Sequence, residues 1–236
     1  MTKKRRSKIR KSDILRNKKL LKRYPWLMPR NIWTGKIPED YDFSYIEWFG
    51  WPQGWNKAFG TMFLKEIGAE IKKSRLIHFQ VEQMKEKYGQ MRCYCTGYNR
   101  KTGDIITKYE FLSENICITC GKPDVPMINN HGWISPECLD CFMRGERHYK
   151  NILKKQDKPF VPWTDEELRQ KYQDAITEEA DENGEYKMAN QYTRRHWDSI
   201  TDKPIDETFD ITETANAIRE RWKKRREQYA KRKMAR

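Results

Sequence analysis

The sequence predicts an α+β protein: a small treble-clef-like or zinc-ribbon body with an amphipathic helix and a hairpin, followed by a helical C-terminal extension. Three observations lead to this fold class. Two Cys-x-x-Cys pairs supply one metal site, and helical and strand-like periodicities follow one another through the middle of the chain. The 10 Leu, 20 Ile, 3 Val and 9 Phe are only 42 of 236 residues, which excludes a large aliphatic-cored enzyme fold. The 9 Trp and 12 Tyr provide aromatic packing instead.

Charge and composition divide the chain into four segments. These are a basic N-terminal arm (1–23), a Trp/Pro-rich strap (24–53), a zinc-finger body (54–155) and an acidic, then basic, helical extension (156–236). The net charge of +14 is unevenly distributed: residues 1–23 carry +11 and residues 216–236 carry +8, whereas residues 157–215 carry −9. Basic ends of this density attract polyanions. They could instead solubilise the chain or pair with its own acidic stretch.

The arm and the strap are predicted to have little regular structure of their own. The arm has a weak helical stripe, formed by Ile14, Leu15, Leu20 and Leu21, which we expect to become ordered on a partner. Residues 24–35 are rich in Trp and Pro, and proline disfavours helix in the residue before it. The aromatic density continues through Trp48, Trp51 and Trp55. We expect these aromatic side chains to dock on the body, with stacking on nucleic-acid bases as the alternative.

The body is predicted to open with a helix and a hairpin. From about residue 54 to 75, apolar side chains recur at four-residue steps: Trp55, Phe59, Phe63, Ile67 and Ile71. This pattern is typical of a core helix with no chemistry of its own. Residues 81–88 fit a helix or a strand. Residues 90–96 alternate as a strand does, 99–103 reads as a turn and 104–109 as the returning strand.

Cys117, Cys120, Cys138 and Cys141 are predicted to hold one structural zinc ion. Two residues between paired cysteines allow a tight turn that points both sulfurs at one ion, and Gly121 frees the backbone after the first pair. Four thiolates complete the tetrahedron and leave no open position for water or substrate. A short strand at 132–135 and a helix at 139–153 would complete a treble-clef-like finger, with a zinc ribbon as the alternative.

Two further features could carry chemistry. Cys93 and Cys95 lie on one face of a predicted strand, where they read as buried core thiols. The alternative is a second metal site with His78 or His131. The run Asn-Asn-His that ends at His131 superficially resembles the motif of treble-clef nucleases. The seventeen-residue gap is short for a catalytic hairpin, however, and no acidic residue precedes the histidine. We therefore predict no catalytic residue and keep nuclease activity as an alternative.

The C-terminal third is predicted to be helical. Thr164 and Glu167 fit a capping box at the start of one helix. Residues 186–200 are expected to form another helix, with a break at Pro204. A final helix from Asp210 or Thr212 has a narrow seam at alternating four- and three-residue steps: Ile211, Ala215, Ile218, Trp222, Arg225 and Tyr229. This seam could pack on the chain's own body, on a partner helix, or place the helix against nucleic acid.

Several motifs resemble a group of uncharacterised phage and prophage proteins. They are Tyr24-Pro25-Trp26-Leu27 with Arg30-Asn31 and Trp33-Thr34-Gly35, the block Gln83-Met84-Lys85-Glu86-Lys87-Tyr88-Gly89-Gln90-Met91-Arg92, and Gly132-Trp133-Ile134-Ser135 between the cysteine pairs. The resemblance covers roughly residues 20–145. It implies a zinc finger and a mobile-element origin, and it brings no established activity.

Together these features predict a phage-type, non-enzymatic accessory protein that binds nucleic acid or a nucleoprotein complex through its basic ends. The expected contact residues are Lys3, Lys4, Arg5, Arg6, Lys8, Arg10, Lys11, Lys223, Lys224, Arg225, Arg226, Lys231 and Arg232. The alternative is an anti-defence inhibitor that binds a host defence or transcription complex, with residues 157–215 as a nucleic-acid mimic. No apolar stretch approaches the ~20 residues that span a membrane, and no apolar core follows the basic N-terminus. We expect a cytoplasmic location and leave the oligomeric state open.

Overall fold

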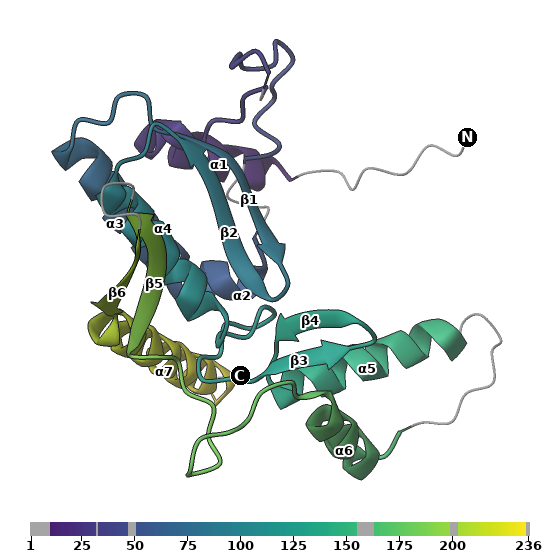
Figure 1. Cartoon of the computed structure of the whole chain (residues 1–236). Coiled ribbons are helices and arrows are strands. Elements are labelled where there is room, and N and C mark those ends of the chain that lie inside the picture. The colour runs from purple at the N-terminus through teal and green to yellow at the C-terminus, as the bar shows by residue number, and fades with distance from the viewer. Residues whose placement is uncertain (1–9, 32, 47–50, 155–162, 199–202, 235–236) are drawn as a thin grey trace.

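A computed structural model describes residues 10–31, 33–46, 51–154, 163–198 and 203–234 of the chain (Figure 1). The helices are α1 (Lys11–Arg23), α2 (Gln53–Trp55), α3 (Thr61–Lys73), α4 (Arg100–Ser113), α5 (Leu139–Lys154), α6 (Asp165–Ala175) and α7 (Thr212–Met234), with a 3-10 turn η1 (Pro25–Leu27) and a π-helical turn η3 (Asn56–Gly60). The strands form three separate antiparallel hairpins: β1 (Gln80–Lys87) with β2 (Gln90–Thr96), β3 (Met127–Asn130) with β4 (Trp133–Pro136), and β5 (Gln191–Asp198) with β6 (Lys203–Asp210). The predicted α+β class is confirmed.

An aromatic core joins the continuous helix α2–η3–α3 to α4. The predicted stripe is confirmed, because Trp55, Phe59, Phe63 and Ile67 are all fully buried. Phe63 meets Tyr109 of α4 edge-on, with ring centroids 5.3 Å apart. Aromatic side chains bury a large area each, so a few of them can replace the missing aliphatic residues.

The first hairpin differs from the predicted one. Of residues 81–88, which fitted a helix or a strand, residues 81–87 lie in strand β1, which pairs with β2 through a tight turn at Tyr88 and Gly89. Residues 104–109 lie in α4, so their assignment as a returning strand is wrong. Asn99 starts α4 with a capping box, in which the side chains of Asn99 and Thr102 each accept a hydrogen bond from the other's backbone N–H. The helix is more stable here than a strand, because it buries Ile106, Tyr109 and Leu112 on one face against the core.

The arm and the strap pack on this core. Leu21 of α1 is buried, and the Asn17 amide donates to the Phe43 carbonyl at 2.7 Å. From Lys11 on, the expectation that the arm orders only on a partner is therefore wrong. Among the strap aromatics, Trp26 is buried and meets Phe79 edge-on at 5.5 Å. Docking is confirmed for Trp26, Trp51 and Trp55, whereas Trp33 is 88% exposed and Trp48 lies outside the described residues.

The C-terminal third contains a hairpin where a helix was expected. The capping box at Thr164 is confirmed, and α7 begins at Thr212 as predicted. Residues 191–198 form β5 instead of a helix, and Pro204 lies within β6 opposite Trp197. The strand form lets the Tyr192 ring stack on Phe111 and Phe209, with centroids 4.7 and 4.9 Å away. Those partners are distant in sequence, so local periodicity could not reveal the strand.

The finger, which consists of the two cysteine pairs with β3, β4, α5 and α6, lies to one side of the body that contains the aromatic core. In Figure 1, β3, β4, α5 and α6 form the lower right part, while α7 and the β5–β6 hairpin lie beside α4. The finger has its own small core, made of Ile128, Phe142, Met143, Leu168 and Tyr172. Within the described residues, no helix has the length and apolar character needed to cross a membrane.

Candidate metal centre

The four predicted cysteine ligands converge. The sulfur atoms of Cys117, Cys120, Cys138 and Cys141 all lie within 4.8 Å of one another, and those of Cys120 and Cys138 are 3.7 Å apart. A tetrahedral site with metal–sulfur bonds of about 2.3 Å has sulfur–sulfur edges of roughly 3.8 Å. The cluster therefore has the size and the donor set of a closed four-thiolate metal site.

The first pair forms a tight backbone turn. The Cys117 N–H donates to the Lys122 carbonyl at 2.8 Å, and the Gly121 N–H donates to the Cys117 carbonyl at 2.9 Å. Gly121 has φ +80°, a left-handed conformation that glycine adopts without steric cost. The predicted reason for a glycine directly after the pair is therefore confirmed.

The second pair sits at the start of α5. The N–H groups of Cys141 and Phe142 both donate to the Cys138 carbonyl at 3.0 Å, which opens the helix. The Ile118 N–H donates to the Pro136 carbonyl at 3.0 Å and ties the first turn to the end of β4. The order of a cysteine turn, a short hairpin and a cysteine pair at a helix start is the predicted treble-clef-like arrangement.

The four thiols lie close enough for each to affect the ionisation of the others. Hydrogen bonds from Cys117, Cys138 and Cys141 lower the pKa of the Cys120 thiol, whereas hydrogen bonds to Cys117 and Cys120 raise the pKa values of Cys138 and Cys141. Four thiolates this close would repel each other without a cation. A bound divalent cation would stabilise all four in the ionised form.

Glycines attach the metal centre to the aromatic core. The Gly54 N–H donates to the Ile118 carbonyl at 2.8 Å. A Cβ on Gly54 would lie 2.1 Å from the Cys117 carbonyl oxygen, and one on Gly121 would lie 2.4 Å from the Gly54 carbonyl oxygen. The indole N–H of Trp55 also donates to the Ile116 carbonyl at 2.9 Å. The close backbone contact between Gly54 and the cysteine turn has no sequence motif, and sequence reasoning missed it.

Helix α7 is held against the same centre by three arginines. The Arg219 guanidinium forms a bidentate salt bridge with the Asp124 carboxylate, with N–O distances of 2.8 and 2.9 Å. The Arg221 and Arg225 side chains donate to the carbonyls of Lys57 and Cys120, at 3.2 and 2.9 Å. A cavity of about 180 Å³ lies where α7 meets the finger, and its lining includes Lys122, Arg144, Trp222 and Arg226 beside three of the cysteines.

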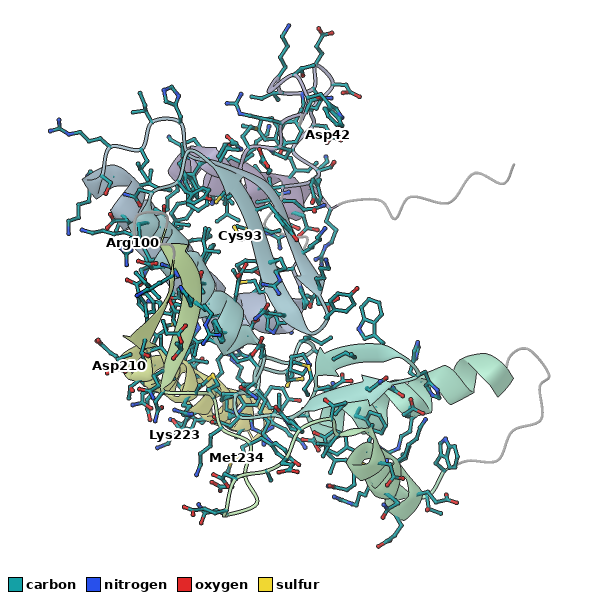
Figure 2. All side chains as sticks on the ribbon, viewed as in Figure 1. Asp42, Cys93, Arg100, Asp210, Lys223 and Met234 are labelled. Atoms are coloured by element: carbon teal, nitrogen blue, oxygen red, sulfur yellow. The ribbon has the colours of Figure 1, made fainter. Side chains whose placement is uncertain are left out.

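The predicted nucleic-acid contacts lie in two separate places. Lys3, Lys4, Arg5, Arg6 and Lys8 lie outside the described residues, and Arg10 and Lys11 are exposed at the start of α1. On α7, Lys223, Lys224, Arg226, Lys231 and Arg232 are exposed, with Lys223 at the lower edge of the molecule (Figure 2). Arg225 is half-buried and fixes the helix to the finger instead. Figure 1 places α1 and α7 at opposite ends of the body.

The two thiols of β2 are apart from the metal centre. Cys93 is buried on β2 and Cys95 is partly buried, as predicted for core thiols (Figure 2). A hydrogen bond with Cys93 lowers the pKa of Cys95. In the described part of the chain, the one group of three or more potential metal ligands is the four-cysteine cluster, so no second site with His78 or His131 forms there.

The Asn-Asn-His run serves the β3–β4 hairpin. The side-chain amide oxygen of Asn129 accepts from the Gly132 N–H at 2.9 Å, and the side-chain amide of Asn130 donates to the Glu146 carboxylate at 3.1 Å. The ring of His131 lies 3.3 Å from the Lys171 ammonium. These contacts hold the Asn-Asn-His run in the turn of the hairpin and connect it to α5 and α6.

The comparisons with known proteins give no family for this chain. No protein-family model matches it, and neither does any curated protein or solved structure.

Proposed function

We propose that this chain is a non-enzymatic, zinc-stabilised protein that binds nucleic acid or a nucleoprotein complex, with α7 as its principal contact. One observation carries the proposal: a strongly basic helix is fixed at one end to the cysteine centre and is exposed along the rest. Zinc is the proposed metal, because a closed set of four thiolates suits it and leaves a structural role. The resemblance to phage proteins supports an accessory role in a mobile element.

The burial pattern of α7 separates an anchor from a contact surface. Ile211, Ala215 and Ile218 are buried, and Trp222 and Arg225 are half-buried, so the first part of the predicted seam packs on the chain's own body. Every residue from 226 to 234 is exposed, and Tyr229 is 68% exposed. Residues 223–234 carry seven Lys or Arg and one Glu, a net charge of +6.

The ion pairs of the basic ends leave this surface available. In the described residues, Arg10 and Arg16 pair with Asp13 within α1, and Arg219 pairs with Asp124. The Arg219 guanidinium also donates to the Met188 carbonyl at 3.2 Å, so its contact with the 157–215 stretch is to the backbone and not to an acidic side chain. Lys122 and Arg144 of the finger lie beside Arg226 around the same cavity, with Asp140 as its one acid, so positive side chains outnumber the negative one there. The face shared by α7 and the finger thus has the charge that phosphates require.

Nucleic-acid binding would be dominated by phosphate contacts. Each neutralised phosphate releases counterions, so the logarithm of the binding constant falls with the logarithm of salt concentration by about 0.9 per contact on duplex DNA. This slope distinguishes α7 contacts from a general effect of protein charge. It also separates direct contacts from loss of fold, which would abolish binding at every salt concentration.

The test is a fluorescence-anisotropy titration of labelled duplex DNA over a salt series. The variant K223A/K224A/R226A removes three exposed cations from α7, and K65A/K72A/K73A removes three exposed cations from α3 as a charge-matched control. We expect weaker binding and a salt slope smaller by about 2–3 for the α7 variant, with a small change for the control. Equal effects of both variants, or no binding by the intact protein at low salt, would refute the proposal.

A protein-binding inhibitor is the second candidate, and exposure of the acidic region favours it. Asp165, Glu166 and Glu167 are all exposed in the first turn of α6. A nuclease-treated pull-down from host lysate with the intact chain tests this candidate. A partner protein whose capture requires these three acids, and not the three α7 cations, would favour inhibition over nucleic-acid binding.

A further inference from the structure

Two exposed aromatic side chains meet at one cavity on the side of the molecule that joins the body to the finger. Tyr88, at the tip of the β1–β2 hairpin, is 74% exposed, and Trp133, at the tip of the β3–β4 hairpin, is 61% exposed. Both line a cavity of about 380 Å³ together with Lys87 and Ile134. This volume falls in the range of small-ligand sites, about 300–1,000 Å³.

The tip of the β1–β2 hairpin is docked on the open end of the β3–β4 hairpin, where β3 begins and β4 ends, so the two hairpins that carry the rings are fixed relative to each other. A Cβ on Gly89 would lie 2.4 Å from the Met127 sulfur and 3.3 Å from the Pro136 ring. Figure 1 shows the end of the β1–β2 hairpin reaching β4. The aromatic rings are therefore presented by two short hairpins held in contact, rather than by a loose loop.

Both rings stand at turns with unusual backbone. Tyr88 and Gly89 have φ +53° and +78°, and His131 and Gly132 have φ +55° and +85°. Two-residue hairpin turns with positive φ at both positions favour Asn or Asp followed by Gly. A bulky tyrosine at the first position is strained, and its ring gains little burial in return. Strain of this kind at an exposed position points to a function for the side chain.

We propose that Tyr88 and Trp133 form a stacking site for a base of single-stranded nucleic acid, with Lys87 contacting the adjacent phosphate. This inference rests on the proposed function. It adds to the α7 surface a second contact, the Tyr88–Trp133 cavity, which would bind single-stranded nucleic acid. Aromatic side chains stack on every base, because each base has a π-face. The Lys87 ammonium lies 5.4 Å from the centre of the Tyr88 ring, where it can approach a phosphate of a stacked nucleotide.

The cavity is lined by one cation, Lys87, and one acid, Glu86. Glu86 accepts a hydrogen bond from the Gly89 N–H at 2.6 Å and is thereby held in the turn. The two exposed aromatic rings, rather than a net positive charge, are what favours a nucleotide base over an acidic side chain at this cavity.

The experiment compares a labelled thymidine 20-mer with an abasic 20-mer, which keeps the phosphates and lacks the bases. The variants are Y88A/W133A, the ring-conserving Y88F/W133F, and Y98A/W33A, which removes two exposed rings outside the cavity. We expect the intact protein to prefer the thymidine strand. Y88A/W133A should lose roughly 5- to 150-fold in affinity for it, with little change toward the abasic strand. Y88F/W133F and Y98A/W33A should keep the preference.

A stability measurement removes the ambiguity of a misfolded variant. Tyr88→Asn places a residue that tolerates positive φ in the turn, so it should raise the melting temperature while it lowers the preference for thymidine. Equal affinity of the intact protein for both strands, or a preference that survives in Y88A/W133A, would overturn the stacking site and leave the proposed function standing. If neither strand bound at low salt, both the stacking site and nucleic-acid binding as a whole would be overturned.

Discussion

The helical body and the cysteine finger are neighbours that are stabilised in different ways. In the body, Trp55, Phe59, Phe63 and Tyr109 are almost completely buried in one aromatic core. Around the metal centre, the buried cluster consists of the cysteines with Val125. The body is therefore stabilised by one large hydrophobic core, whereas the finger has a small core and a separate cluster of cysteines that could bind a metal ion.

The difference shows how a chain poor in aliphatic residues can fold. Large aromatic side chains give the body a large buried area, and a metal ion on the four cysteines would add to the small core of the finger. The two regions are nevertheless joined backbone to backbone at Gly54 and Gly121. Substitutions in the finger, in the body and at this junction should therefore have different effects on metal binding and on the free energy of unfolding.

The largest effect is expected from Cys138→Ser. Structural zinc contributes about 10–16 kcal/mol to zinc-finger peptides, so loss of one ligand should abolish metal binding and unfold the finger. Metal analysis and hydrogen exchange across residues 117–141 measure both results. Cys93→Ser is the matched control, because this thiol is buried outside the metal centre. One bound metal per Cys138→Ser chain, with protection unchanged, would contradict the assignment.

The second effect is expected from Phe63→Ala in the body. Truncation of a fully buried phenylalanine costs about 3–5 kcal/mol, and Phe63 contacts both Trp51 and Tyr109. Denaturant unfolding should show this loss, while the folded fraction still binds one metal ion. If metal binding fell in parallel with stability, the two regions would be one cooperative unit rather than two.

The third effect concerns the junction. Gly54→Ala would place a methyl group 2.1 Å from the Cys117 carbonyl oxygen, so the finger must move away from the body. Overpacking of this kind costs about 1–3 kcal/mol or more, and we expect both lower thermal stability and weaker metal retention against a chelator. Gly145→Ala on α5 meets nothing within 4 Å and should stabilise the chain instead. Equal melting temperatures for the two variants would argue against the contact.

The smallest effect is expected from pH. Burial raises the pKa of Glu114, which lies at the end of α4 and accepts a hydrogen bond from the Gln90 amide. The folded state thus holds this proton more tightly than the unfolded state. The resulting penalty is absent below the unfolded pKa of about 4.3 and grows as pH rises through the higher folded value.

Glu114→Gln should remove that penalty and keep the hydrogen bond, because an amide oxygen also accepts. Unfolding curves between pH 4 and 8 should show a variant that is more stable at the upper end, by an amount typical of a mild substitution, about 1 kcal/mol or less. The difference should vanish near pH 4. A variant that is less stable at neutral pH would show that the charged form makes a favourable contact.

The sequence by itself determined the features that depend on a few neighbouring residues. The Cys-x-x-Cys pairs predicted which sulfurs converge, the Thr164–Glu167 box predicted where α6 begins, and the apolar stripe predicted the helix of the aromatic core. Each signal is local, because spacing, capping and periodicity act within one or two turns of chain.

Only the tertiary structure decided the features that depend on distant partners. Residues 104–109 became helix because the core lies beside α4, and residues 191–198 became strand because Tyr192 stacks between rings from α4 and β6. The contact of Gly54 with the cysteine turn, the docking of α7 and the meeting of Tyr88 with Trp133 at one cavity likewise join segments far apart in sequence. Such contacts form when separate elements pack, and local propensity carries no record of which elements will meet.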